Sequence, residues 1–400
     1  MNRSVEITDF VQHELDFLET LHQRRSLKRL EQESAARVSY SGKILINFSS
    51  NDYLGLASHP RVKAAAQEAI DRYHASAASS RLICGNLEVH ERLEAEIARF
   101  KQREAALVFS SGYLANLGIL AALAGENDQI FSDALNHASI IDGCRLSRAQ
   151  VLVYRHRDLD HLESLLRQAP PARRRLLVSD AVFSMGGDIV DLPDLVRLAR
   201  AHDCLLILDE AHATGVLGQT GHGTVEHFAA QGMISAGEQC VNLEMGTLSK
   251  AVGSFGGFVA CSASMREFLI NKARSFIFST ALPPASAGAG IEGLRLIEEE
   301  PFRRKTLWQH FGSLKHQLEA HGFDVSGAQT PILPLTFGEE AFALHMSQQL
   351  AAMGYFVPAI RPPSVPKGTS RLRITLSAAH SAEEVKGLGD ALAMLAGKKS

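Results

Sequence analysis

A carboxylate stands out in this sequence because it directly follows an apolar, strand-like run. In the segment CLLILDEAHATG, Asp209 comes at the carboxyl end of that run. Open α/β sheets place their ligand-binding groups at the carboxyl ends of strands, so Asp209 is a candidate functional carboxylate. Taken alone, it could equally serve only to cap the following turn.

A candidate amine, Lys250, lies in the segment VNLEMGTLSKAVGSFGG. Its neighbours are small or apolar, which predicts a buried ammonium group, although a lysine in a flexible surface loop is the alternative. A buried amine must be paired, neutralised or consumed in a covalent bond to a carbonyl compound. Because small neighbours leave room for such a bond, we predict that Lys250 forms a Schiff base.

A third segment, FSSGYLANLGILAALAG, predicts a strand that enters a helix through Ser110, Ser111, Gly112 and Tyr113. The backbone N–H groups at the start of a helix lack partners within the helix and can hold a phosphate. Many strand-to-helix turns look similar, so this signal gains weight only together with Asp209 and Lys250.

The elements that must position these residues follow an α/β pattern. Between residues 44 and 264, short runs of Val, Ile, Leu and Phe alternate with amphipathic helical patterns, which predicts parallel strands joined by crossover helices. The predicted strands cover residues 44–48, 106–109, 129–131, 151–154, 176–178, 205–208, 240–245 and 257–261. The predicted helices between them include residues 61–73, 87–100, 159–168 and 192–202.

The two ends of the chain have other patterns. Residues 7–33 predict a charged amphipathic helix followed by a loop, and after Pro283 and Pro284 the pattern changes to long helices and then short strands. These later helices are predicted at residues 285–300 and 301–321, and the strands at 332–337 and 371–376. We predict an N-terminal helical arm (residues 1–43), a large α/β domain (44–284) and a small C-terminal α+β domain (285–400), with a ligand site in the crevice between the two domains.

Composition excludes several classes of protein. With 400 residues, 46% of them hydrophobic and 21% charged, the chain can bury a large core. Its 41 Lys and Arg against 44 Asp and Glu give a net charge of −3, which predicts no general attraction to nucleic acid or anionic membranes. The five cysteines are dispersed without a CxxC pair, which predicts reduced thiols and no metal site. Since no signal peptide or long apolar run is present, we expect a cytoplasmic protein without membrane spans.

Two further motifs favour other functions only superficially. Residues 209–212 read DEAH, as in nucleic-acid-dependent ATPases, but the chain lacks the GxxxxGK[ST] loop that those proteins need for phosphate binding. Gly288, Gly290 and Gly293 form a GxGxxG pattern that follows two prolines instead of a strand, which predicts close helix packing and not a dinucleotide site.

Together, Asp209, Lys250 and the phosphate-binding helix start resemble fold-type I enzymes that use pyridoxal 5'-phosphate. More narrowly, the chain is similar to the α-oxoamine synthase family from about residue 25 to its C-terminal helix. The motifs that carry the resemblance, in family order, are NFSSNDYLGL (47–56), SSGYLAN (110–116), NHASIIDG (136–143), VFSMGGD (182–188), LDEAHATG (208–215), GTLSKAVG (246–253) and RPPSVPKGTSRLRITLSAAH (361–380). The resemblance implies a mostly parallel central sheet flanked by helices, with a smaller α+β domain.

The resemblance also implies roles around the cofactor. Lys250 would hold pyridoxal 5'-phosphate covalently and act as base at the substrate Cα, Asp209 would pair with the pyridine nitrogen, and His137 would stack on the ring. The remaining implied cofactor contacts are His212 and Ser184 at the phenolic oxygen, the N–H groups of Gly112 and Tyr113 with the Thr247 hydroxyl at the phosphate, and Ser279 and Thr280 from the neighbouring subunit of a homodimer.

On the substrate side, Arg361 matches the family's carboxylate-binding arginine, although alone it could be a salt-bridged surface residue. Asn51 would support the carboxylate end of the amino acid. Arg25 and Ser364 match positions that contact the acyl thioester. The chain departs from the family pattern at a few positions. These are Ala77, Ala78 and Cys84 in place of a glycine-rich stretch, Ser364 where threonine is usual, and Arg155, His156 and Arg157 at an HND-like site.

The closest branch of the family serves biotin synthesis and implies a condensation of L-alanine with pimeloyl-CoA or a pimeloyl carrier protein, with loss of CO2. The alternative is a glycine C-acetyltransferase, which shares every cofactor residue and differs in its substrates, or another α-oxoamine synthase. A catalytically inactive homologue that serves dimerisation or regulation is an alternative of another class. The presence of both Lys250 and Asp209 argues against it.

Overall fold

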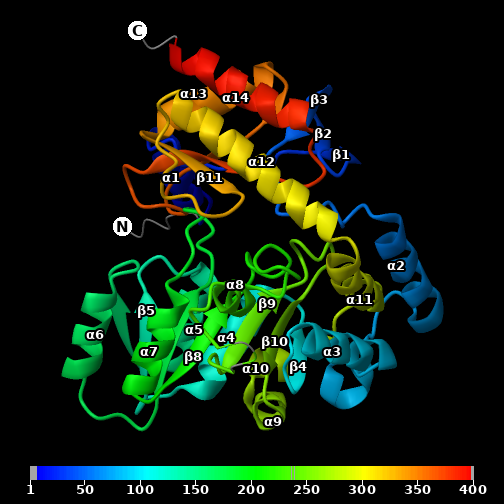
Figure 1. Cartoon of the computed structure of the whole chain (residues 1–400), viewed down its shortest axis with the longest axis vertical. Helices are drawn as coiled ribbons and strands as arrows, with labels where there is room; N and C mark the ends of the chain where they lie inside the picture. Colours follow the sequence, from blue (N-terminus) through cyan, green and yellow to red (C-terminus); the bar gives the residue numbers. More distant parts are fainter. Residues whose placement is uncertain (1–6, 236, 238, 398–400) are drawn as a thin grey trace, which may run out of the picture. The chain divides into compact units, whose positions relative to one another are not determined.

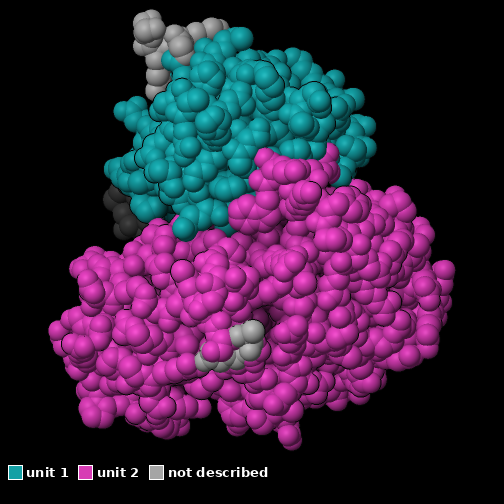
Figure 2. All heavy atoms as spheres, in the orientation of Figure 1, with its two compact units in different colours: residues 1–50, 310–376, 380–400 teal, residues 51–309, 377–379 magenta. Residues whose placement is uncertain are grey.

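The computed structural model describes residues 7–235, 237 and 239–397. They form two compact units (Figure 2), which we call unit 1 and unit 2. Unit 1 contains the described residues up to 50, residues 310–376 and those from 380 onward, and unit 2 contains residues 51–309 and 377–379. The boundary predicted from the sequence between the two domains, after residue 284, differs from the bounds of these units. That the predicted segments are domains that fold separately stays a prediction.

Unit 2 is built on a seven-stranded sheet with the order β4-β10-β9-β8-β7-β5-β6 (Figure 1). Its strands are β4 (Ala105–Phe109), β5 (Gln129–Asp133), β6 (Gln150–Tyr154), β7 (Arg175–Asp180), β8 (Cys204–Asp209), β9 (Leu243–Thr247) and β10 (Gly257–Cys261). β10 runs antiparallel to both of its neighbours, and the other pairs are parallel, which confirms the predicted mostly parallel sheet. β9 begins later than predicted because the apolar Cys240 and Val241 are buried in the preceding loop.

The helices of unit 2 pack on this sheet or on one another. They are α2 (Pro60–Tyr73), α3 (Glu88–Phe100), α4 (Gly112–Leu123), α5 (Ala138–Ser147), α6 (Leu159–Gln168), α7 (Leu192–Ala201), α8 (Thr224–Ala230), α9 (Ala263–Lys272), α10 (Arg274–Ile277) and α11 (Pro284–Glu299), with one π-helical turn, η1 (Arg81–Gly85). α2, for example, packs on α11. α4 is apolar on almost every side, and its Ile119 and Leu120 are fully buried. A helix of this kind belongs in the interior, where α4 packs with sheet residues such as Val178 and Ile207 in one core.

Unit 1 is the smaller α+β part. Its strands form a four-stranded sheet of β1 (Glu31–Ser34), β2 (Arg37–Tyr40), β3 (Lys43–Asn47) and β12 (Tyr355–Phe356), and a three-stranded sheet of β11 (Ile332–Gly338), β14 (Ser370–Thr375) and β13 (Ala359–Ile360). Its helices are α1 (Ile7–Thr20), α13 (Glu340–Ala352) and α14 (Ala382–Gly397), while α12 (Pro301–Ala320) begins in unit 2 and ends in unit 1.

Two predictions about the N-terminal region were wrong in this unit. The strand predicted at residues 44–48 exists as β3, but it belongs to the sheet of unit 1 instead of the large sheet. The turn at Ser41 and Gly42, both with positive φ, folds β3 back onto β2. The loop predicted before residue 33 contains β1, which pairs with β2. Apolar alternation predicts a strand, but it does not identify the partner strand.

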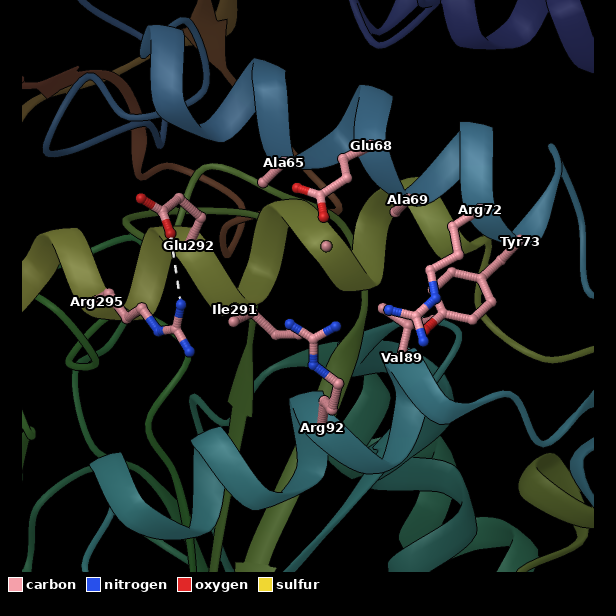
Figure 3. Close-up of a pocket in the computed structure, with 11 residues that line it drawn as sticks. Ala65, Glu68, Ala69, Arg72, Tyr73, Val89, Arg92, Ile291, Glu292 and Arg295 are labelled. Atoms are coloured by element: carbon pink, nitrogen blue, oxygen red, sulfur yellow. Dashed lines mark ion pairs between the residues drawn. The ribbon is translucent and has the colours of Figure 1, made fainter.

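The glycines of α11 confirm the prediction of close packing. A Cβ atom on Gly288 would lie 2.5 Å from the carbonyl oxygen of Ala65 in α2, and one on Gly293 would lie 2.1 Å from that of Val252. Figure 3 shows Ala65 and Ala69 of α2 beside α11, near the ion pair of Glu292 and Arg295. Only residues without a side chain allow these backbones to approach so closely.

We expect Gly293→Ala to lower the free energy of unfolding by about 1–3 kcal/mol, because the added methyl group overlaps a backbone oxygen. The matched control is Gly312→Ala in α12, where the added Cβ meets nothing within 4 Å. In the control, alanine's better helix propensity should raise stability by up to about 1 kcal/mol. Urea denaturation measures both variants, and equal effects would contradict the packing argument.

Candidate active site

A cavity of about 210 Å³ in unit 2 lies at the carboxyl ends of β7, β8 and β9. Its lining includes the predicted residues Gly112, Tyr113, His137, Ser184, Asp209, His212, Thr247 and Lys250. It also includes Ser111, Ser139, Asp180, Ala211, Met245 and Ser249, which the sequence analysis did not assign as site residues. The carboxylate, the amine and the helix start that were singled out separately therefore meet in one place.

Asp209 is held in this cavity by neutral hydrogen-bond donors. Its side chain is nearly buried, and Oδ2 accepts a hydrogen bond from Asn116 Nδ2 at 2.8 Å. Its Oδ1 accepts another from the backbone N–H of Ala211 at 2.9 Å. Asn116 also donates to Ser139 Oγ at 2.9 Å. As an amide within the otherwise apolar α4, Asn116 needs a buried hydrogen-bond partner, but its own segment does not identify that partner.

His137 caps α5 and lies between charged groups. Its Nδ1 is 2.7 Å from Ser139 Oγ, and its backbone N–H donates to Asp180 Oδ2 at 3.0 Å. Burial lowers the pKa of His137, and the charge of Lys250 lowers it further while Asp209 opposes the shift. The ring is therefore a neutral imidazole near pH 7.

Asp180 was missed by the sequence analysis, although it ends β7 as Asp209 ends the neighbouring β8. The two aspartates are register partners in adjacent parallel strands. Burial raises the pKa of Asp180 well above its usual value, and the nearby Asp209 raises it further. The two carboxylates at this sheet edge have different partners: Asp180 accepts the His137 backbone N–H, and Asp209 accepts from Asn116 and Ala211.

A tyrosine that the sequence analysis did not single out positions His212. The hydroxyl oxygen of Tyr53 is 2.6 Å from His212 Nδ1, and both side chains are buried. Tyr53 belongs to the quoted motif NFSSNDYLGL, so its position was visible, but its partner lies 159 residues away. The contact fixes how the His212 ring is turned toward the cavity.

One end of the cavity is suited to a phosphate. α4 begins after Ser111, whose Oγ accepts the backbone N–H of Leu114 at 3.2 Å, and the N–H groups of the first helical residues have no partner within the helix. The Thr247 side chain lies next to Gly112, and its hydroxyl oxygen is 2.7 Å from Ser249 Oγ. β10 reaches this point through Gly257, where a Cβ would lie 2.5 Å from the backbone nitrogen of Gly112.

Three predicted residues of unit 2 do not line this cavity: Asn51, Ser279 and Thr280. Ser279 Oγ is 3.3 Å from Ser110 Oγ, and the carbonyl oxygen of Thr280 accepts a hydrogen bond from Ser110 at 3.0 Å. Since Ser279 and Thr280 are predicted to serve the site of a neighbouring subunit, a single chain does not test their role.

The predicted substrate residues of unit 1 lie together in a second cavity of about 600 Å³. Arg25 donates hydrogen bonds to Ser364 Oγ at 3.1 Å and to the Pro362 carbonyl at 3.3 Å, and Arg361 donates to the His22 carbonyl. Lys28 also lines the cavity, and burial and the charge of Arg361 lower its pKa. This concentration of positive charge suits an anionic ligand.

We expect Asn116→Ala to lower the free energy of unfolding by about 1–3 kcal/mol, because the buried Asp209 carboxylate would lose a donor. The control is Asn271→Ala in α9, whose amide donates to the Glu267 carbonyl at the protein surface. Urea denaturation followed by circular dichroism compares the two. A loss no larger for Asn116 than for Asn271 would show that Asp209 does not need this partner.

No helix in the described part of the chain is long and apolar enough to cross a membrane. Among the described residues, no group of three or more His, Cys, Asp or Glu side chains is placed to hold a metal ion.

The model of the family "Aminotransferase class I and II" matches residues 43–392. The chain is 46% identical to an 8-amino-7-oxononanoate synthase of Lysinibacillus sphaericus over 95% of this chain and 96% of that protein. It is 47% identical to one of Anaeromyxobacter dehalogenans over 96% of this chain and 95% of that protein.

Solved structures of related enzymes have the same fold as this chain. A serine palmitoyltransferase of S. paucimobilis with a bound PLP-myriocin aldimine has a TM-score of 0.91 at 30% identity, covering 100% of this chain and 99% of that one. An 8-amino-7-oxononanoate synthase of Francisella tularensis has a TM-score of 0.75 at 29% identity, covering 89% of this chain and 98% of that one. The resemblance and the fold class predicted from the sequence are thus confirmed, and the chain belongs to the aminotransferase class I and II family and, within it, to the 8-amino-7-oxononanoate synthases.

Proposed function

We propose that this protein joins L-alanine to a pimeloyl thioester, with loss of CO2 and release of CoA or a carrier protein, to give 8-amino-7-oxononanoate for biotin synthesis. The observation that carries the proposal is the cavity of unit 2, in which Lys250, Asp209 and the start of α4 come together. The near full-length similarity to 8-amino-7-oxononanoate synthases supports the choice of reaction.

The residues of this cavity fit pyridoxal 5'-phosphate. The first N–H groups of α4 and the Thr247 hydroxyl would take its phosphate, the Asp209 carboxylate its pyridine nitrogen, and the Lys250 amine its aldehyde carbon. His212 and Ser184 would donate to the phenolic oxygen. When bound, the cofactor supplies an electron sink that stabilises a carbanion at the substrate Cα.

The chain's own residues then have distinct tasks. The buried Asp209 carboxylate would hold a proton at the pyridine nitrogen, and Asn116 keeps that carboxylate in place. Once the amino group of alanine has displaced its amine, Lys250 would take the proton from the alanine Cα and later return a proton to the product. The neutral His137 ring would offer a flat face to the cofactor. It would add no positive charge that competes with the pyridine nitrogen for Asp209.

In unit 1, Arg361 would bind the carboxylate of the amino acid through its guanidinium fork. Arg25 and Ser364, already hydrogen-bonded to each other, would meet the acyl donor. Serine keeps the hydroxyl of the threonine usual at position 364, so this departure preserves the contact.

The experiment that tests the function compares two substrate pairs. We expect release of CoA with L-alanine and pimeloyl-CoA, and little with glycine and acetyl-CoA. Lys250→Ala should abolish turnover because no other group replaces the covalent amine, while Lys272→Ala at the exposed end of α9 should leave it unchanged. The opposite substrate preference would identify a glycine C-acetyltransferase, and no turnover with either pair would favour an inactive homologue.

We also propose that the protein forms a homodimer whose sites are shared. An exposed apolar patch next to Ser279 and Thr280 supports this: Leu82 and Ile83 of η1 are 51% and 80% exposed, and Phe278 is 71% exposed. A second copy that covered these side chains would bring its own Ser279 and Thr280 toward a neighbouring site. The free cysteines support the cytoplasm as the location.

Mixed dimers test the shared site. The variants Lys250→Ala and Ser279→Ala/Thr280→Ala should each be impaired alone. After co-refolding, mixed dimers should regain activity, because one of the two sites then has an intact Lys250 and intact partner residues. Activity that never exceeds the sum of the separate variants would contradict a shared site, and sedimentation confirms that the dimers have formed.

A further inference from the structure

His156 connects two loops that carry proposed cofactor residues. Its Nδ1 is 2.9 Å from Asp133 Oδ1, and its Nε2 is 2.9 Å from Asp188 Oδ2. Asp133 ends β5 and precedes the turn to His137, while Asp188 ends the loop that contains Ser184. The imidazole is thus a bridge between these two loops, and it lines neither of the two cavities described above.

Asp133 shapes the turn that presents His137. Its side chain is 1% exposed, and besides His156 it accepts hydrogen bonds from the backbone N–H groups of Leu135 at 2.8 Å and Arg157 at 2.9 Å. The carboxylate therefore fixes both the start of the turn and the segment after β6. A shift of Asp133 would move the His137 backbone with it.

Asp188 closes the loop that presents Ser184. Its carbonyl accepts the N–H of Phe183 at 3.0 Å, so Ser184 lies within a loop whose two ends are joined. A Cβ on Gly186 would lie 2.1 Å from Asp188 Oδ1, which shows that the loop backbone packs directly on this carboxylate. The carboxylate side chain is 12% exposed, and its contact with His156 anchors the loop.

Two carboxylates need two N–H donors, and only a protonated imidazole has both. Burial alone lowers the pKa of His156, but the hydrogen bonds and charges of Asp133 and Asp188 outweigh burial and raise it to about 9. The other groups around the bridge are Arg157, which is 4.0 Å from Asp188 and pairs with Asp191 at 3.1 Å, the buried Tyr154 hydroxyl near Asp133, and the Phe183 ring.

We propose that doubly protonated His156 is a positioning residue, which holds the His137 turn and the Ser184 loop in the relative arrangement that binds the cofactor. The inference rests on the proposed function for the roles of His137 and Ser184, but the bridge itself does not. Because the folded pKa lies above the ordinary 6.5, the stability that the bridge contributes is complete below about pH 6.5 and is lost as the pH rises through about 9.

The bridge is tested first without cofactor. In the full-length, cofactor-free protein labelled with 15N-histidine, the His156 ring should show two protonated nitrogens at about pH 8 and titrate near pH 9. His156→Gln assigns the signal by removing it. A ring that is neutral at about pH 8 would overturn the proposal, whether or not the variant folds and whether or not the protein is an enzyme.

The positioning role is tested by the dissociation constant of pyridoxal 5'-phosphate. At about pH 7, His156→Gln should raise this dissociation constant about tenfold or more. The ratio of the variant's dissociation constant to that of the wild type should approach one at about pH 10, where the wild-type imidazole is neutral. The matched control is His161→Gln in α6, whose Nδ1 accepts the Arg155 N–H at 3.0 Å and which contacts neither aspartate of the bridge. Its ratio should stay near one at both pH values.

A double-mutant comparison separates positioning from general loosening. The effects of His156→Gln and Ser184→Ala on cofactor affinity should be non-additive, because they act on the same loop, whereas those of His156→Gln and Thr247→Ala should add. A ratio that does not change with pH, or additivity with Ser184→Ala, would overturn the positioning role. Failure of the wild-type protein to bind the cofactor would instead contradict the proposed function and leave the titration of His156 as the test of the bridge.

Discussion

The proposed cofactor site depends on one carboxylate, Asp209, that is held in a nearly buried position. A buried charge is costly unless hydrogen bonds replace the lost water, and Asn116 and the Ala211 N–H provide them for Asp209. Its charge then influences its neighbours, because it helps to raise the pKa of Asp180 and opposes the lowering of the pKa of His137. In the proposed function Asp209 faces a cationic ligand atom, while burial disfavours the charged forms of Asp180 and His137 beside it.

The sheet explains why these groups meet. β7 and β8 are parallel and in register, so their last residues, Asp180 and Asp209, lie side by side. The strands and helices next to them end or begin at the same edge, where Gly257 lets β10 approach the start of α4. The proposed site residues thus lie along one edge of the sheet. Glycine is needed at this edge where two backbones come too close for a side chain.

Local sequence patterns predicted the positions of helices and strands better than they predicted which strands pair with one another. The bounds predicted for α6 and β10 agree with the structure, because both are short segments with clear limits. β3 was placed in the wrong sheet, since pairing with β2 and β12 depends on a tight turn and on residues about 300 positions away. Long-range pairing leaves no periodic signal in a single segment.

The same limit applies to the site. Asp209 and Lys250 could be predicted because each follows an apolar strand, although Lys250 is half-buried and not fully buried as its small and apolar neighbours predicted. Tyr53 and Asn116 act through partners 159 and 93 residues away, and His156 acts through two aspartates in other loops, so single segments gave no role for them. Arg25 and Ser364 were predicted to meet one substrate through resemblance alone, and they lie 3.1 Å apart.

The account depends most directly on the identity of the amine that binds the cofactor. Borohydride reduction of the protein loaded with pyridoxal 5'-phosphate, followed by digestion and peptide mass spectrometry, identifies that amine. We predict a single stable adduct on Lys250. An adduct on another lysine, such as the fully buried Lys101 beside Glu210, or no adduct at all, would contradict the account.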